Sequence, residues 1–299
     1  MMNWMRYRLV YLTISLVVIG VGVFSLLKWG LRLGVDFTGG SNLEYKFSQN
    51  ISTEVASQEI ENLGINVTSV QSTGDNSYLF KLPYISQDDE EKITGALKEK
   101  TKTDITLLRF ENVGPAIGPE LIKKTIYAIV ISAGMILLWV AYQFKSIKFG
   151  TSAVLAMFHD SLVLIGSYAL FGHIWKAEID FLFVTAMLTI LSFSVHDTIV
   201  VYDRIRETQR KVGGSLMDLA NKALTQTMVR SLNNSFTIIF MLTALILLGG
   251  TTVKWFAAAL FVGTVSGTYS SPFVAVPLLV TWDEIEKKVK SIKSMRKKS

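Results

Sequence analysis

Residues 181–207 read FLFVTAMLTILSFSVHDTIVVYDRIRE, and this stretch decides the fold class. The part before Ser194 carries no charge, and an apolar run of about 18 residues or more is long enough to cross a bilayer as a helix. Asp197 follows within the same run. A charged group at the bilayer centre costs roughly 2.5–3.5 kcal/mol on insertion scales. We therefore expect Asp197 to have either a partner or a role.

The whole chain repeats this pattern. It has 299 residues, 50% of them hydrophobic, and a helix satisfies its own backbone hydrogen bonds in lipid. These features predict a polytopic helical membrane protein with six spans. The first apolar run is too long for a signal peptide and continues into a folded region, so we expect residues 1–27 to form a cytoplasmic N-terminus followed by a retained helix. The predicted spans are about 9–27, 124–143, 150–171, 181–203, 233–250 and 255–281.

Positive charges are distributed unevenly among the connections. Of the 30 Lys and Arg residues, more than half lie in the N-terminus, in the second and fourth connections and in the basic segment 282–299. Only Lys176 and Lys254 lie in the third and fifth connections. This is the positive-inside pattern, which predicts that both termini are cytoplasmic. It also explains the net charge of +6 without nucleic-acid binding. The basic tail is either a topology anchor or a contact for anionic headgroups or a ribosome.

One connection, residues 28–123, is long enough to form a domain, and the parity of the spans places it outside the cell. Alternating residues at 41–48 predict a strand, and SYLFKL predicts another after the turn Gly74–Asn76. Segments 52–64 and 86–100 each begin with a capping serine and predict helices. The expected order β-α-β-β-α-β is that of an α+β ferredoxin-like domain. The chain has no cysteine, so this domain has no disulfide.

Two further features concern the segment before the fifth span and the sixth span itself. Residues 215–229 place apolar side chains on one face, which predicts a cytoplasmic amphipathic helix. The sixth span carries small residues at helical spacing, which favour close helix packing or, alternatively, a groove for a moving helix. These small residues are Gly263, Ser266, Gly267, Ser270 and Ser271.

Asp197 and Arg230 are the expected pair inside the membrane. Burial alone favours the neutral form of a carboxyl group, whereas a nearby guanidinium favours the charged form. If the two effects nearly cancel, the carboxyl group can load and release a proton, which would make Asp197 the centre of a proton relay. The alternative is a static ion pair that only joins two helices.

Asp160, His196 and Asn234 are further candidates for the same path. The dipeptides His159–Asp160 and His196–Asp197 also suggest a metal site, but neighbouring side chains diverge by about 100° on a helix, and no further ligands stand at suitable spacing. A packed neutral histidine is the alternative for His196. Nucleophile, phosphate-loop and zinc-protease motifs are absent, so we expect neither an enzyme nor a bound cofactor or metal.

Five motifs, in order along nearly the whole chain, resemble the SecF family of membrane subunits that work with SecD at the Sec translocon. They are GVDFTGGS (34–41), VGPAIGPEL (113–121), HDSLVLIG (159–166), SVHDTIVVYDRIRE (194–207) and VRSLNNSFT (229–237). The resemblance implies membership of the resistance-nodulation-division superfamily, with half of a twelve-helix unit in this chain. The family's essential carboxylate and arginine then fall on Asp197 and Arg230. His196 stands where the family commonly has Asn.

The resemblance also implies a function. With SecD, the protein would use the proton-motive force to promote preprotein translocation and release, as a multi-pass protein of the bacterial cytoplasmic (inner) membrane. The implied partners are SecD, the SecYEG translocon, YajC and the unfolded preprotein. The coupling ion is expected to be H⁺, with Na⁺ as an alternative. Two other functions remain open: a proton-coupled half-transporter for a small molecule or lipid, and a structural assembly subunit without ion coupling.

Overall fold

The computed structural model describes residues 2–114 and 117–296 and separates into two compact units. The membrane unit comprises Met1–Arg32 and Ala128–Ser299, and the sheet unit comprises Leu33–Tyr127, so that helix α5 (Ile117–Phe144) begins in the sheet unit and continues into the membrane unit. Residues 115–116, within VGPAIGPEL, and 297–299, at the end of the basic tail, lie outside the described part of the chain. Each unit is described by itself.

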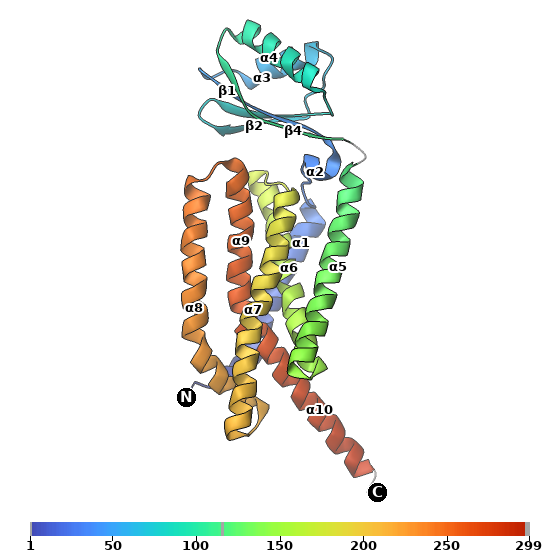
Figure 1. The fold of residues 1–299 in the computed structure, drawn as a ribbon, viewed down its shortest axis with the longest axis vertical. Coiled ribbons are helices and arrows are strands. Elements are labelled where there is room, and N and C mark those ends of the chain that lie inside the picture. Colours follow the sequence, from blue (N-terminus) through green and yellow to red (C-terminus); the bar gives the residue numbers. More distant parts are fainter. Residues whose placement is uncertain (1, 115–116, 297–299) are drawn as a thin grey trace. The chain divides into compact units, whose positions relative to one another are not determined.

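Within the described residues, six helical segments are long and apolar enough to cross a membrane, by length and composition. This number agrees with the sequence prediction, and each segment is longer than its predicted span. The helices of the membrane unit are η1 (Trp4–Tyr7), α1 (Arg8–Trp29), α5 (Ile117–Phe144), α6 (Ile147–Trp175), α7 (Phe181–Val212), α8 (Leu216–Leu248), α9 (Thr251–Ser270), η2 (Ser271–Ala275) and α10 (Val276–Arg296) (Figure 1).

Two of these helices differ from the sequence prediction. The expected amphipathic helix at 215–229 and the fifth span form one continuous helix, α8, because residues 216–248 contain neither glycine nor proline. Its N-cap is Ser215, whose hydroxyl accepts from the Asp218 amide. The sixth span is interrupted: α9 passes into η2, a π-helical turn with Pro272 near its start, before α10 continues.

The second unit is a four-stranded antiparallel sheet with helices α3 and α4 on one face (Figure 1). The elements follow the predicted β-α-β-β-α-β order, and the strands lie side by side as β2-β3-β1-β4. Ser52 and Ser86 cap the two helices, and Ser86 forms a capping box with Asp89. The bounds are α2 (Val35–Thr38), β1 (Gly40–Phe47), α3 (Thr53–Asn62), β2 (Ser69–Gly74), β3 (Ser77–Leu82), α4 (Gln87–Thr101) and β4 (Ile105–Val113).

The one-turn helix α2 lies within GVDFTGGS and was not predicted. Gly39 and Gly40 follow it with φ of 74° and 123°, a region that side chains other than glycine rarely adopt. A Cβ on Gly40 would lie 2.7 Å from the Leu82 carbonyl oxygen in β3. The glycine pair therefore allows the chain to turn from α2 directly into the central strand β1.

A buried polar cluster ties this sheet to α4. The Tyr45 hydroxyl donates to the Glu90 carboxylate at 3.0 Å, and the Thr94 hydroxyl lies 2.7 Å from that carboxylate and 2.9 Å from the Tyr45 oxygen. Burial, the largest cause, raises the pKa of the Tyr45 phenol above its ordinary value. The cluster therefore satisfies two polar groups that would otherwise weaken the apolar core.

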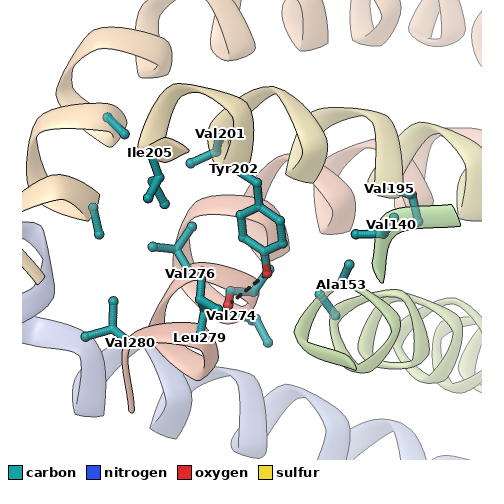
Figure 2. Close-up of a cluster of buried hydrophobic side chains, with 14 of the residues drawn as sticks. Val140, Ala153, Val195, Val201, Tyr202, Ile205, Val274, Val276, Leu279 and Val280 are labelled. Atoms are coloured by element: carbon teal, nitrogen blue, oxygen red, sulfur yellow. Dashed lines mark hydrogen bonds between the residues drawn. The ribbon is translucent and has the colours of Figure 1, made fainter. Parts of the chain in front are cut away.

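Within the membrane unit, α6, α7 and the α9–α10 segment are the most buried helices. Half or more of the 18-residue apolar stretch of each is buried, whereas the buried share is 17% for α1 and 11% each for α5 and α8. Figure 2 shows part of their shared core, in which Tyr202 of α7 lies among aliphatic side chains of α7 and the η2–α10 segment. The three buried helices therefore define the interior in which a polar site must be sought.

Helices of the membrane unit cross closely at glycines, α6 with α1 and α9 with α7. A Cβ on Gly166 of α6 would lie 2.4 Å from the Gly22 Cα of α1, and one on Gly263 of α9 would lie 2.1 Å from the Ile190 side chain of α7. Distances this short leave no room for a methyl group. The predicted close packing at Gly263 is therefore confirmed.

We predict that Gly166→Ala destabilises the membrane unit by about 1–3 kcal/mol, because the added methyl group meets the backbone of α1 rather than a movable side chain. Gly20→Ala is the matched control, since nothing lies within 4 Å of a Cβ at Gly20. Thermal unfolding in detergent measures both. Equal melting temperatures for the two variants would contradict the described crossing of α1 and α6.

Candidate functional site

Asp160 of α6 is the most completely buried acidic side chain in the interior of the membrane unit. It is 0% exposed, and three serine hydroxyls donate to its carboxylate. Ser194 of α7 and Ser270 of α9 both lie 2.6 Å from Oδ2, and Ser266 of α9 lies 2.5 Å from Oδ1. Asp160 thus joins α6, α7 and α9 through hydrogen bonds to a single carboxylate.

His159 supplies a fourth contact. Its Nδ1 lies 3.0 Å from Asp160 Oδ1 and donates when it carries the ring proton. The helical spacing predicts that neighbouring His and Asp side chains diverge, but here they touch. His159 Nε2 is buried and has no hydrogen-bond partner within the described residues. No Lys or Arg in the described ranges forms an ion pair with Asp160.

The sequence places these serines by simple periodicity. Ser266 and Ser270 stand four residues apart in α9, so they lie on one face one turn apart. That face packs against α6 and α7, where Gly267 allows close approach to Ser194. Small residues at this spacing predict close packing or a groove for a moving helix, and neither prediction includes a hydrogen bond to Asp160. Their hydroxyl groups on one face of an apolar helix were a signal that a buried acceptor lies opposite.

Asp197 of α7 is also buried, at 6% exposed, but its surroundings are sparser. The Ser231 hydroxyl of α8 lies 2.8 and 2.7 Å from its two oxygens. The hydroxyl of Ser271 in η2 bonds to groups next to Asp197: it donates to the Ser194 carbonyl oxygen at 3.2 Å and lies 3.0 Å from the Thr198 hydroxyl. One hydroxyl carries one proton, so Ser231 cannot donate a full hydrogen bond to both carboxylate oxygens of Asp197 at once.

The expected ion pair between Asp197 and Arg230 is wrong for this structure. Among the described residues, the ion pairs formed by arginine do not include one with Asp197. Arg230 is exposed, and its neighbour Ser231 faces α7 instead. Consecutive residues diverge by about 100° on a helix, so only one of the two can face Asp197.

Among the described residues, neither Asn234 nor His196 forms a hydrogen bond to Asp160 or Asp197. Asn234 is exposed on α8. His196 is exposed on α7 and lines a pocket of about 380 Å³ between α5 and α7. Within the described ranges, groups of three or more His, Cys, Asp or Glu side chains that could hold a metal ion are absent.

The two buried carboxylates differ in the number of donors around them. An ionised carboxylate offers about four lone-pair sites, and four donors surround Asp160. Asp197 receives its closest contacts from one hydroxyl, Ser231. A proton arriving at Asp160 would have to displace a donor, whereas Asp197 retains acceptor capacity. The arrangement therefore provides one anchored carboxylate and one with room for a proton.

Two family models match most of the chain. Residues 93–285 match the family model described as "Protein export membrane protein SecD/SecF, C-terminal", and residues 24–51 match the SecD/SecF GG motif. The protein translocase subunit SecF of Thermobaculum terrenum is 42% identical over 95% of this chain and 94% of its own length. A SecF from Anaerolinea thermophila is 37% identical over 96% of both chains.

A solved structure shares the fold. The crystal structure of SecDF from Thermus thermophilus, described as a translocon-associated membrane protein, matches with a TM-score of 0.82 and 32% identity. The match covers 95% of this chain and 39% of the SecDF chain. The present chain therefore corresponds to less than half of that longer protein.

We predict that Asp160→Asn lowers the thermal stability of the protein more than Asp197→Asn does. Asn offers one acceptor oxygen where four donors converge, and hydrogen bonds to a charged group contribute about 1.5–3 kcal/mol each. We expect a loss of at least about 2 kcal/mol for Asp160→Asn. Unfolding curves in detergent measure it. A wild-type melting temperature for Asp160→Asn would show that Asp160 does not join the helices.

Proposed function

This chain belongs to the SecD/SecF family of protein export membrane proteins, and on that basis we propose that it is an accessory subunit of the Sec machinery. With SecD, it uses the proton-motive force to promote preprotein translocation and release across the bacterial cytoplasmic membrane. Its work is transport rather than enzymatic catalysis, and it needs no cofactor beyond the coupling ion.

The observation that carries the ion-coupling part is the environment of Asp197. It is a buried carboxylate in a membrane-spanning helix, with Ser231 as its close donor. A carboxyl group with spare acceptor capacity takes up a proton without displacing a partner. The membrane potential supplies roughly 2.3 kcal/mol per charge per 100 mV, enough to bias such a step. Asp197 is therefore the proton carrier, and Asp160 is the carboxyl group that joins α6, α7 and α9.

H⁺ is the coupling ion that this geometry favours. A sodium ion needs several oxygen ligands at once, and among the described residues Ser231 is the one hydroxyl with a hydrogen bond to Asp197. A proton needs a single lone pair. Dependence of export on a sodium gradient, in vesicles without a pH gradient, would favour Na⁺ instead.

SecD is the partner that best explains why α8 exposes polar side chains on one face. Arg230, Asn233, Asn234 and Thr237 are all exposed in a membrane-spanning helix, where lipid contact would be costly. Relatives named SecDF, from Thermus thermophilus and Bacillus subtilis, are 34% and 29% identical to this chain, which covers 37% and 35% of their lengths. We propose that SecD covers this polar face and completes a twelve-helix unit of the resistance-nodulation-division type. Arg230 and Asn234 then act through the interface with SecD.

The sheet unit is the part that meets substrate. Its β-α-β-β-α-β order supports a ferredoxin-like assignment, and the distribution of positive charge supports a place outside the membrane, with both termini in the cytoplasm. There it contacts the domains of SecD and the emerging preprotein. SecYEG and YajC are the further partners expected of such a subunit. The role of His196 in the pocket beside α5 is secondary to that of Asp197.

We predict that Asp197→Asn reduces export to the level of a deletion while the protein and SecD remain at normal membrane levels. The neutral side chain keeps the shape of Asp197 but cannot exchange a proton. Pulse-chase labelling of a secreted protein measures the rate. Asp203→Asn is the matched control, because Asp203 lies on the same helix, is exposed and pairs with Arg206. Normal export in Asp197→Asn cells would leave only a structural assembly role.

We also predict that the double variant Arg230→Ala/Asn234→Leu co-purifies with several-fold less SecD. Both side chains are exposed in this chain, so its own melting temperature should not change. Arg210→Ala, an exposed arginine of α7, is the control and should leave the complex intact. An undiminished yield of complex from the double variant would remove this face of α8 from the SecD interface.

A further inference from the structure

The membrane half of α8 has few buried side chains that fix how it faces the rest of the bundle. Within residues 228–248, Ser235 and Leu242 are the two that are buried. Successive residues of a helix are turned by about 100° from one another, so a small rotation of α8 about its axis changes which side chain faces α7. The side chain that meets Asp197 therefore depends on the few contacts that α8 makes with its neighbours.

Ser235 makes one of these contacts, with Thr268 of α9. The Thr268 hydroxyl donates to the Ser235 oxygen at 2.6 Å and also lies 2.6 Å from the Thr264 carbonyl oxygen. Ser235 is 2% exposed, and its own hydroxyl donates to the Ser231 carbonyl oxygen at 3.0 Å. Among the described residues, the Thr268–Ser235 contact is the one side-chain hydrogen bond between α8 and α9. It lies one helical turn from Ser231.

Ser231 and Ser235 stand four residues apart, so they project from the same face of α8. The Ser231 hydroxyl lies 2.8 and 2.7 Å from the two oxygens of Asp197 in α7, whereas Ser235 is held by α9. One face of α8 is thus bonded to two helices. A rotation by one residue would break both bonds, and it would turn the exposed side chain of Arg230 or Leu232 toward α7.

We propose that Ser235 and Thr268 are positioning residues for the carboxyl group of Asp197. Their hydrogen bond fixes the rotation of α8, so that Ser231 rather than Arg230 faces this carboxyl group. Neither residue contacts Asp197 through a hydrogen bond, and both act through Ser231. The inference rests on the proposed function, because it takes Asp197 as the proton carrier.

Infrared difference spectroscopy of the full chain, reconstituted in lipid with SecD, tests the proposal through the C=O band of protonated Asp197. The loss of this band in Asp197→Asn assigns it. A carboxyl C=O group vibrates at higher frequency when it loses a hydrogen-bond donor. Ser231→Ala should therefore move the band to higher frequency, and this shift is the reference for the other variants.

Thr268→Val keeps the branched shape of the side chain but removes its hydroxyl, and it should move the band in the same direction. Ser235→Ala removes the other partner and should do the same. In a Ser231→Ala background neither change should add a further shift, whereas Thr268→Ser alone should keep the wild-type band. Thr243→Val is the matched control, because the Thr243 hydroxyl of α8 donates to the Ile239 carbonyl oxygen of its own helix at 2.7 Å. It should leave the band in place.

Four outcomes decide between the claims. A band that stays in place in Thr268→Val and Ser235→Ala, while Ser231→Ala moves it, would overturn the positioning role and leave the proposed function standing. Shifts that add to that of Ser231→Ala would also overturn it, because they would not act through Ser231. A band that Ser231→Ala does not move would overturn the contact on which the positioning depends. A band that persists in Asp197→Asn would overturn the proposed function itself.

Discussion

The site depends on one constraint. The Asp160 carboxylate is buried in the membrane unit, and no Lys or Arg among the described residues pairs with it. Asp160 meets this constraint with hydroxyl donors from α7 and α9 and with the imidazole of its neighbour His159. Burying a charge is tolerable only when its acceptors are satisfied. The three most buried helices must therefore keep their mutual positions for Asp160 to remain where it is.

The densely hydrogen-bonded Asp160 differs from Asp197, whose hydrogen bonds come from Ser231. Ser194 donates to Asp160 and lies one turn before Asp197, so the rigid contact and the adaptable one share a helix. Ser266 and Ser270 of α9 donate to Asp160, and Gly263 and Gly267 let α9 approach α7 closely. Ion coupling of the kind we propose needs both properties: a frame that does not move and a carboxyl group whose partners can change.

The sequence was sufficient for features that depend on local periodicity. Six apolar runs predicted six membrane segments, and capping serines with alternating strands predicted the order of the sheet unit. Features that depend on which helix face meets which neighbour were not predictable. Arg230 was chosen as the partner of Asp197 by charge, but Ser231 faces α7. The serines of α9 were interpreted as packing residues because their acceptor, Asp160, is more than a hundred positions away in the chain.

Infrared difference spectroscopy of the protein in lipid, between acidic and alkaline buffer, tests the central claim most directly. The account predicts a protonated carboxyl C=O band on acidification that is absent from Asp197→Asn and retained in Ser266→Ala, which alters only the surroundings of Asp160. A band that survives in Asp197→Asn would show that another group carries the proton, and the division between an anchored and an exchanging carboxylate would be wrong.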